Sequence, residues 1–337
     1  MVSAAKSLTA YGGLSPGWFL RRDGLLIANQ LIHAGHHIFI SFAVFLFYSV
    51  YSLICGLAMP HYEFAFAADD FTRIQRSIYR LAGIVLAAGK QDFVYGRLAR
   101  RVRAKGLPSF QAYLDAIDAG DAVERDLFVN ALTTNHTSFF REPHHFTLLD
   151  EQLRQARQRS PQAPLRIWCA GSSTGEEAWS LAITACDAFD SMMPPVSILA
   201  SDIDSQALKV AADGVYPAER VALPAPRLTK FFVPGAASKT LAVRPELKAL
   251  VRFTRINLLD GRWPVNTLLG DPVDAIFCRN VMIYFDRETQ YAILKKFHPL
   301  LGREGRLYAG HSEIFTHAVD LFRPLGRTVY APSGVVR

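Results

Sequence analysis

Residues 133–142, TTNHTSFFRE, combine side chains that can bind a polar, charged ligand. The run contains amide and hydroxyl groups, two aromatic rings and one guanidinium. Asn135 and Thr137 can hydrogen-bond such a ligand, and Arg141 has a planar fork that matches carboxylate oxygens. The run therefore indicates a binding segment, although an ordinary polar helix end is the alternative.

Residues 171–177, GSSTGEE, lie where an expected strand turns into a helix. Gly171 lets a ligand approach the backbone at such a turn. Glu176 and Glu177 suit a ligand with a positive charge, or else they complement the helix dipole. Asp202 ends the next expected strand, where an acid typically binds ribose hydroxyls. A solvated aspartate at a strand end is the competing interpretation.

Two later segments add further functional groups. Residues 278–286, CRNVMIYFD, supply the guanidinium of Arg279, the amide of Asn280 and the phenol of Tyr284 directly after an expected central strand. Asn257 and Leu258 follow another short strand and on their own would form a routine loop. Residues 310–313, GHSE, include a histidine for which we favour a structural role over that of a ligand or base.

The elements that position these groups fall into two kinds. Residues 70–132 have apolar side chains at three- and four-residue spacing, which predicts four short helices with one buried face each. We expect a helical domain over residues 59–148 and a linker over 149–164. One predicted helix has a basic surface that contains Arg97, Arg100 and Arg101. Three interpretations are open: a surface that docks an acidic partner, a solvated face, or an RNA-binding patch.

From residue 165 onward, short apolar strands alternate with helices. The strands are expected at residues 165–170, 196–201, 274–278 and 305–309, which predicts a doubly wound parallel sheet. Residues 216–253 are rich in proline and short β-like pieces, so we expect a small β-subdomain inserted into a domain that spans 165–337. Ligands bind such sheets at the carboxyl ends of the strands, where the segments above lie.

Composition limits the class of protein. The chain has 337 residues, 50% hydrophobic and 20% charged, which is enough for two domains with separate cores. Its net charge of +7 favours an acidic partner: nucleic acid, an anionic membrane or an acidic protein surface. The four cysteines show no CxxC spacing, so neither a zinc site nor a disulfide framework is indicated, which fits a reducing cytoplasm.

Residues 1–58 need a separate interpretation. Residues 38–58 contain no charge and are long enough to span a hydrocarbon core of roughly 30 Å. Basic residues precede this stretch, so a membrane anchor would export everything that follows it. Our preferred interpretation is that residues 1–58 are translated from a misplaced start codon, with translation starting at Met59. A real anchor and a soluble apolar helix are the alternatives.

The four segments together resemble one family. TTNHTSFFRE, the stretch from Cys169 to Ser180, the stretch from Ala200 to Asp204 and CRNVMIYFD are similar, in the same order, to the motifs of CheR-type chemotaxis methyltransferases. The likeness runs from about Phe71 to Tyr330. One departure is Ala178-Trp179, where the family usually has a Pro-Tyr pair. The resemblance implies a Rossmann-like methyltransferase domain, preceded by a small all-α domain.

The resemblance also implies roles for individual residues. The family uses S-adenosylmethionine (SAM), and the matching positions for cofactor binding are Asn135, Thr137, Arg141, Gly171, Glu176, Glu177, Asp202, Asn257, Leu258, Arg279 and Asn280. Catalytic roles fall to Arg141 and Tyr284, the latter beside the transferred methyl group. The docking residues are Arg97, Arg100 and Arg101, and no metal is expected.

The implied reaction is methylation of glutamate carboxylates on chemotaxis receptors, with S-adenosylhomocysteine (SAH) as the second product. We expect a cytoplasmic enzyme that meets acidic, helical receptor regions, does not bind nucleic acid, and reaches the membrane only through the receptor unless residues 38–58 are an anchor. Family members that bind a peptide at the receptor's C-terminus tend to have a longer, glycine-rich loop at the position of residues 233–240. Because the loop is short in this chain, we do not expect the enzyme to be tethered to the receptor in that way. The alternatives are a non-catalytic SAM-binding scaffold and a methyltransferase of the same fold acting on RNA or a small molecule.

Overall fold

A computed structural model describes residues 63–334, and those from Phe64 onward belong to one compact unit. The apolar stretch at residues 38–58 and the start-site question both lie outside the described residues. Within residues 63–334, no helix is both long and apolar enough to cross a membrane.

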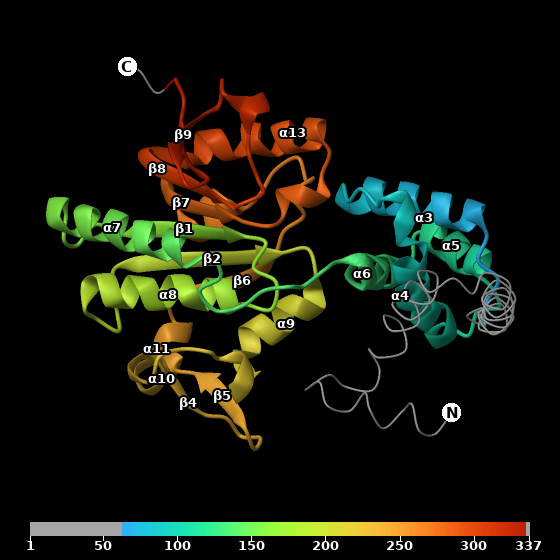
Figure 1. Cartoon of the computed structure of the whole chain (residues 1–337), viewed down its shortest axis with the longest axis horizontal. Helices are drawn as coiled ribbons and strands as arrows, with labels where there is room; N and C mark the ends of the chain where they lie inside the picture. Colours follow the sequence, from blue (N-terminus) through green and yellow to red (C-terminus); the bar gives the residue numbers. More distant parts are fainter. Residues whose placement is uncertain (1–62, 335–337) are drawn as a thin grey trace, which may run out of the picture. The chain divides into compact units, whose positions relative to one another are not determined.

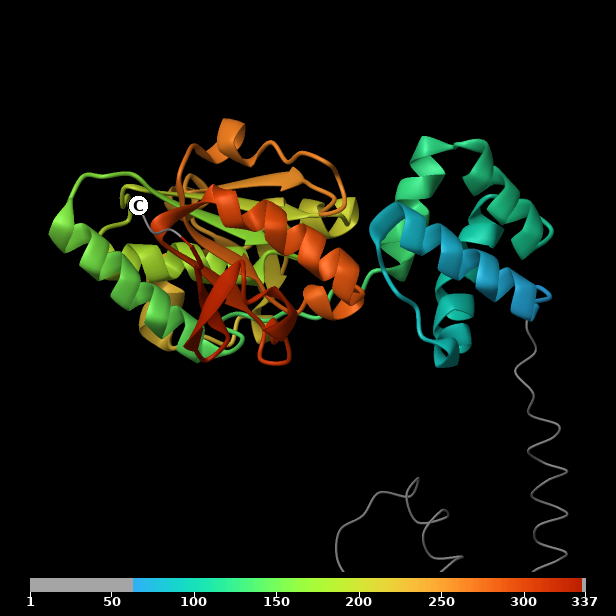
Figure 2. The ribbon, with the colours of Figure 1, turned by 90° about the horizontal axis from the view of Figure 1, so that it is seen from above.

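The first described elements form a helical domain, as the periodicity predicts (Figures 1 and 2). Its elements are α3 (Ala68–Ala82), the short 3-10 turn η1 (Ala88–Lys90), α4 (Gln91–Ala104), α5 (Phe110–Ala119) and α6 (Ala122–Leu132). The predicted apolar stripes meet in one core, which includes Ile74, Val94, Leu98, Leu114 and Phe128.

Local sequence explains where these helices begin and end. The Ser109 side chain accepts a hydrogen bond from the Ala112 backbone N–H and caps α5, and Asp121 caps α6 in the same way at Glu124. Gly83 ends α3 with a φ of 70°, a left-handed conformation that glycine adopts without steric cost. The turn at Gly83 directs the chain toward the sheet domain, where the Val85 N–H donates to the carbonyl of Tyr284.

The region expected to be a linker is largely helical, and that expectation is corrected. Helix α7 spans Pro143–Arg159 and therefore includes most of residues 149–164. Phe146, Leu149 and Leu153 are buried in the same core as the sheet residues, so the helix belongs to the sheet domain. Their spacing of three and four residues was a helical signal, but the exposed glutamine and arginine residues that follow Leu153 obscured it.

The central sheet has seven strands in the order β6-β2-β1-β7-β8-β10-β9. The strands are β1 (Leu165–Ala170), β2 (Val196–Asp202), β6 (Val251–Arg255), β7 (Val273–Cys278), β8 (Leu301–Ala309), β9 (Phe322–Gly326) and β10 (Val329–Pro332). The strands from β6 to β8 are all parallel, as predicted, whereas β10 runs antiparallel to both of its neighbours. The sheet is therefore mixed rather than purely parallel.

Two hydrophobic cores cover the two faces of this sheet. Along β1, Ile167 and Cys169 belong to one core and Trp168 and Ala170 to the other, as expected for side chains that alternate along a strand. Helices α7 and α8 (Glu176–Phe189) pack on the first face, and α13 (Arg287–Phe297) packs on the second (Figure 1). Helices α9 (Ser205–Asp213) and α12 (Val265–Leu269) and the 3-10 turns η3 (Met282–Tyr284), η4 (His298–Leu300) and η5 (Thr316–Ala318) complete the domain.

The expected insertion forms a small β-subdomain. It consists of β3 (Val215–Pro217), the 3-10 turn η2 (Ala218–Arg220), α10 (Ala225–Phe231), β4 (Phe232–Pro234), β5 (Thr240–Val243) and α11 (Pro245–Lys248). Its three strands pair in the order β3-β5-β4, with β5 antiparallel to both neighbours. The chain then returns to the central sheet at β6, so the insertion ends slightly before the predicted residue 253.

Candidate functional site

The predicted cofactor-binding and catalytic residues, except Glu176, meet in one cleft at the carboxyl ends of the parallel strands. The cleft encloses about 930 Å³ of empty space, part of it open to solvent. Its walls include Asn135, Thr137, Arg141, Gly171, Glu177, Asp202, Asn257, Leu258, Arg279, Asn280 and Tyr284. The helical domain contributes Ala82, Ile84 and Leu132, so both domains line the same cleft.

Gly171 is required by the close approach of two loops at the floor of the cleft. It has a φ of 111°, and an added Cβ would lie 2.3 Å from Cγ2 of Val281. No ordinary side chain can occupy that space, because the contact is far inside van der Waals distance. The glycine thus brings the loop after β1 against the loop after β7, whose residues Arg279 and Asn280 also line the cleft.

Asp202 presents a carboxylate at the end of β2. Its two oxygens accept hydrogen bonds from the backbone N–H groups of Ser173 (2.7 Å) and Asp204 (2.9 Å). Burial nevertheless outweighs these bonds and raises the pKa of Asp202 to about 6. A carboxylate held in this way suits a ligand with hydroxyl donors, which restore the solvation that burial has removed.

Glu177 and Arg279 form a buried ion pair on the other side of the cleft. Nε of Arg279 donates to Oε2 of Glu177 over 2.8 Å, and Nη2 lies 2.7 Å from the same oxygen. Arg279 is only 4% exposed, so its charge is paired in a region of low dielectric. Oε1 of Glu177 accepts from the thiol of Cys169 at 3.4 Å, and burial keeps the pKa of that thiol well above its usual range.

Glu176 is placed differently from its neighbour, which corrects its assignment to the cofactor pocket. Its carboxylate is 1% exposed and does not line the cleft. It accepts hydrogen bonds from Thr174 Oγ1 at 2.6 Å and from Arg220 Nη2 at 2.7 Å. Successive helix residues point about 100° apart, so only one of the two glutamates can face the cleft. Glu176 instead ties α8 to the β-subdomain.

Asn135 and Asn257 use their side chains to hold the walls of the cleft. Asn135 Nδ2 donates to Asp204 (2.7 Å), and its Oδ1 accepts from the Ser173 hydroxyl (3.1 Å). Asn257 Nδ2 donates to the carbonyl of Leu81 (2.8 Å) at the end of α3. Asn257 therefore connects the sheet domain to the helical domain, whereas Asn135 fixes the segment after α6 to the sheet domain.

Arg141 and Tyr284 are the polar groups proposed to act on the reacting atoms, and both line the cleft. Nη1 of Arg141 donates to the carbonyl of His136 at 2.7 Å, which fixes one arm of its fork. Tyr284 ends the 3-10 turn η3, and its backbone carbonyl accepts from Val85 of the helical domain. The two side chains come from different elements but converge on one opening, as the sequence motifs predict.

Glu313 and Asp204 are site residues whose importance sequence reasoning missed. Glu313 is 3% exposed and accepts hydrogen bonds from backbone N–H groups in the loop that carries Asn280. Asp204 is 2% exposed and accepts from Asn135 and from the Thr133 hydroxyl. Both acids lie inside motifs named above, Asp204 in residues 200–204 and Glu313 in residues 310–313. Their hydrogen-bond partners, however, lie far away along the chain, so no local pattern in the sequence indicated these contacts.

The three docking arginines are not equivalent. Arg97 and Arg100 are exposed on α4. Arg101 instead forms two hydrogen bonds to the buried carboxylate of Glu124, at 2.9 and 2.8 Å, and Tyr113 donates to the same carboxylate. Arg101 therefore holds the helical domain together, and its assignment as a docking residue is withdrawn.

The donor set fits a cofactor with a cationic centre, a carboxylate and hydroxyls. Glu177 and Asp202 offer anionic acceptors. Arg279 also lines the cleft, but its side chain is 0% exposed and its Nη2 lies 2.7 Å from Oε2 of Glu177, so its charge is held by that carboxylate. Arg141, which lines the cleft too, offers a guanidinium whose fork matches a ligand carboxylate.

The doubly wound sheet with a cleft at the carboxyl ends of its strands defines a nucleotide-binding class of fold. Residues 69–133 match the CheR methyltransferase all-alpha domain, and residues 135–331 match the CheR methyltransferase SAM binding domain. Both matches agree with the helical domain and the sheet domain described above, with α7 in the latter.

The chain also matches related proteins over nearly their whole length. The chain is 49% identical over 275 residues to chemotaxis protein methyltransferase 2 of Pseudomonas aeruginosa, covering 80% of this chain and 95% of that protein. It is 46% identical over 273 residues to the chemotaxis protein methyltransferase of Salmonella typhimurium, covering 80% and 92%. For the Escherichia coli protein, the identity is 43% over 290 residues, covering 84% and 98%. The chain therefore belongs to the CheR methyltransferase family, and its sheet domain is a SAM-binding methyltransferase domain.

Proposed function

We propose that this protein transfers the methyl group of SAM to glutamate side-chain carboxylates of chemotaxis receptors, giving glutamyl methyl esters and SAH. The observation that carries the proposal is the convergence of Arg141 and Tyr284 on a cleft whose remaining polar groups suit SAM. The names of the related chemotaxis methyltransferases support the receptor as acceptor.

The cleft residues divide into cofactor contacts and groups at the reacting atoms. Glu177 would hold the cofactor's ammonium group and Asp202 its ribose hydroxyls, and the loop that carries Arg279 and Asn280 would border the cofactor. Asn257 and Leu258 would border the adenine, while Asn135 and Thr137 would line the wall formed by the first motif. When bound, SAM supplies an electrophilic methyl group on a positively charged sulfur.

The acceptor glutamate does not need a general base. Its carboxylate is ionised at neutral pH, since the unperturbed pKa of glutamate is about 4.3. The enzyme must instead hold the attacking oxygen in line with the methyl carbon, and positioning of this kind lowers a barrier by up to roughly 7–11 kcal/mol. The free arm of Arg141 would clamp the carboxylate, and the Tyr284 hydroxyl would orient it.

The acceptor must carry acidic side chains on an accessible surface, and the helical domain offers a surface of opposite charge. Arg97 and Arg100 are exposed on α4. We therefore propose an acidic, helical cytoplasmic region of the receptor as the partner, an enzyme located in the cytoplasm, and membrane contact only through the receptor. Tethering by a receptor C-terminal peptide is not part of the proposal.

The proposal is tested by incubating the full chain with methyl-labelled SAM and a receptor cytoplasmic fragment. Label should enter the receptor and be released as methanol by mild base, because carboxyl methyl esters hydrolyse readily. A receptor fragment whose accessible glutamates are changed to glutamine is the matched control and should remain unlabelled. Transfer to RNA in a parallel reaction, or SAM binding without transfer to any acceptor, would contradict the proposal in favour of an RNA methyltransferase or a scaffold.

A further inference from the structure

Three large apolar side chains are exposed on the segments that surround Tyr284. Val85 and Ile283 are each 51% exposed, and Ile314 is 65% exposed. Single exposed apolar residues are common on protein surfaces and need no explanation. Their position relative to the cleft therefore decides whether these three share a role.

Backbone hydrogen bonds place the three residues beside one another at the cleft. The Val85 N–H donates to the carbonyl of Tyr284 at 2.9 Å, and Ile283 directly precedes Tyr284. The Ile283 N–H donates to Oε1 of Glu313 at 3.3 Å, and Ile314 directly follows Glu313. Val85, Ile283 and Ile314 thus come from three separate loops that meet around Tyr284, and we call these three residues the apolar rim.

The apolar rim borders the cleft without lining it. Ile84 and Tyr284 line the cleft, whereas the adjacent residues Val85 and Ile283 do not, and neither does Ile314. A cofactor inside the cleft therefore does not reach these side chains. Their location beside Tyr284 places them where the second substrate, the methyl acceptor, must approach.

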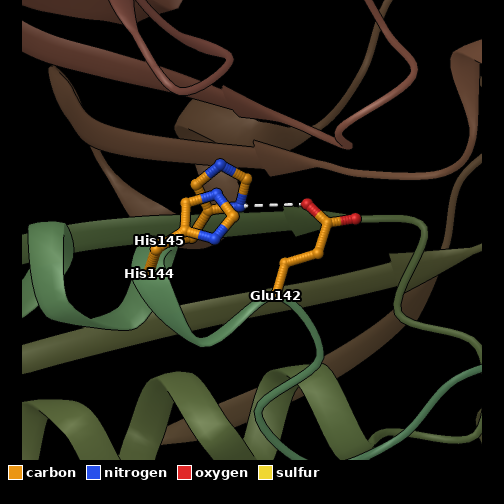
Figure 3. Close-up of side chains that lie close together, drawn as sticks. All are labelled: Glu142, His144 and His145. Carbon is orange, nitrogen blue, oxygen red and sulfur yellow. Dashed lines mark ion pairs between the residues drawn. The ribbon is translucent and has the colours of Figure 1, made fainter.

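The acid that follows Arg141 does not oppose an incoming carboxylate. Figure 3 shows the Glu142 side chain directed toward His145, with Oε2 3.5 Å from Nδ1 of that ring. The same oxygen lies 3.8 Å from Nη1 of Arg279, and Oε1 accepts from the His311 backbone N–H at 3.4 Å. The charge of Glu142 is balanced within the protein, so the Arg141 guanidinium stays available to an acidic acceptor.

We propose that the apolar rim binds the apolar side chains that flank the acceptor glutamate on its helix. This inference rests on the proposed function, because it describes how the same site holds its acceptor. Residues three and four positions from a glutamate lie on the same side of a helix, with Cβ atoms roughly 5–6 Å away. A glutamate that enters the cleft therefore brings these neighbours against the rim. Apolar neighbours gain from leaving water there, whereas charged neighbours would lose hydration without a partner.

The double variant Ile283→Gln with Ile314→Gln, made in the full chain, tests the rim. Both side chains are exposed, so thermal unfolding should be unchanged. We expect KM for the receptor fragment to rise about 5- to 50-fold, because apolar contact with the acceptor is lost. SAH affinity should stay at the wild-type value, and kcat should stay within about threefold of it, since neither side chain touches the cofactor.

Two further variants separate apolar contact from other effects of substitution. Leucine at both positions keeps an apolar surface and should return KM to within about threefold of the wild type. Met193→Gln is the matched control, because Met193 is 79% exposed in the loop before β2, at the amino ends of the strands and therefore opposite the cleft. Its KM should equal that of the wild type.

Salt distinguishes the apolar rim from the exposed arginines of α4. Apolar contacts are not screened, so the ratio of KM between the double glutamine variant and the wild type should persist at high salt, whereas charge effects shrink. Calorimetry with SAH-loaded enzyme adds a readout without turnover. Binding of the receptor fragment should show a less negative heat-capacity change in the double glutamine variant, because less apolar surface is buried.

The outcomes separate this proposal from receptor methylation itself. A labelled receptor with equal KM for the double glutamine variant and the wild type, or leucine variants as weak as the glutamine ones, would overturn the rim and leave the proposed function intact. A fragment that binds without being labelled, and binds the glutamine variant more weakly, would support the rim while contradicting methylation. A fragment that neither binds nor is labelled would overturn both.

Discussion

The carboxylate of Glu313 accepts a hydrogen bond from the backbone N–H of Asn280 at 2.9 Å, although 33 residues separate them in the sequence. The same carboxylate also accepts from the N–H groups of Val281 and Gly310 and, at 3.3 Å, of Ile283. Asn280 has a φ of 57°, a left-handed conformation that is unusual for a residue other than glycine. One buried acid therefore stabilises the strained loop that carries the cleft residues Asn280 and Tyr284.

Replacing Glu313 with glutamine should damage both stability and catalysis. Glutamine has one acceptor oxygen, and its NH₂ group would face backbone N–H donors that then lack an acceptor. Each buried donor left without a partner costs about 1–3 kcal/mol. We expect the free energy of unfolding to fall by about that amount and methyl transfer at saturating SAM to slow about tenfold or more.

The side chain of Glu304 is 72% exposed, so Glu304→Gln is the matched control. This variant should unfold and react like the wild type, because its carboxylate is solvated. Denaturant unfolding and single-turnover transfer rates measure the two effects. Wild-type stability and turnover in Glu313→Gln would show that the loop keeps its shape without the carboxylate.

Arg141→Ala should abolish most methyl transfer while the protein remains folded. The guanidinium lines the cleft, and its only described side-chain hydrogen bond is to the carbonyl of His136. Losing a charged contact made at the reacting atoms costs several kcal/mol, which corresponds to more than about a hundredfold in rate. The check is kcat with the receptor fragment beside thermal unfolding, and near-normal turnover would remove Arg141 from the mechanism.

Cofactor affinity should depend on pH through Asp202. Because its pKa is raised to about 6, the carboxyl is protonated below that pH and ionised above it. Only the ionised form offers both oxygens to ribose hydroxyls, so SAH should bind more tightly as pH rises from 5 to 7. Asp202→Asn cannot titrate, so this variant should bind more weakly at pH 7 and lose the pH dependence that Asp202 causes. Calorimetry from pH 5 to 8 measures both; an identical slope in the two proteins would place the titrating group elsewhere.

The sequence predicted the parts of the fold that local patterns determine. Apolar spacing predicted the helices around Ile74, Leu98 and Leu114, and alternation of strands and helices predicted the parallel core of the sheet. The strands β9 and β10 were missed, because Phe322–Gly326 contains a proline and the turn at Arg327 and Thr328 has no strong local signal. Their place in the sheet depends on pairing with β8, which a local pattern does not contain.

The candidate site was predictable as a set of positions but not as a set of contacts. The motifs located the residues that line the cleft, since the carboxyl ends of parallel strands meet at one edge. They did not reveal that Arg220 pairs with Glu176, 44 residues away, or that Glu313 supports Asn280. Such pairings are tertiary, and the one with Arg220 gives Glu176 a different role from its neighbour Glu177.

Receptor recognition should depend on Arg97 and Arg100 but not on Arg101. Reversing both exposed charges (Arg97→Glu with Arg100→Glu) should raise KM for the receptor fragment about 3- to 30-fold at low ionic strength and leave SAH affinity unchanged. The difference in KM between this variant and the wild type should shrink as salt is added, because exposed charges are screened.

Arg303→Glu with Arg323→Glu is the matched control. It changes the net charge equally, at exposed positions of the sheet domain, and should leave KM unaltered. Arg101→Gln would leave the carboxylate of Glu124, 2% exposed, with only Lys105 at 4.0 Å as a cation, so we expect it to lower the free energy of unfolding by about 3 kcal/mol instead. Steady-state kinetics at two salt concentrations and thermal unfolding distinguish the two kinds of arginine, and equal KM values for both double reversals would show that α4 does not contact the receptor.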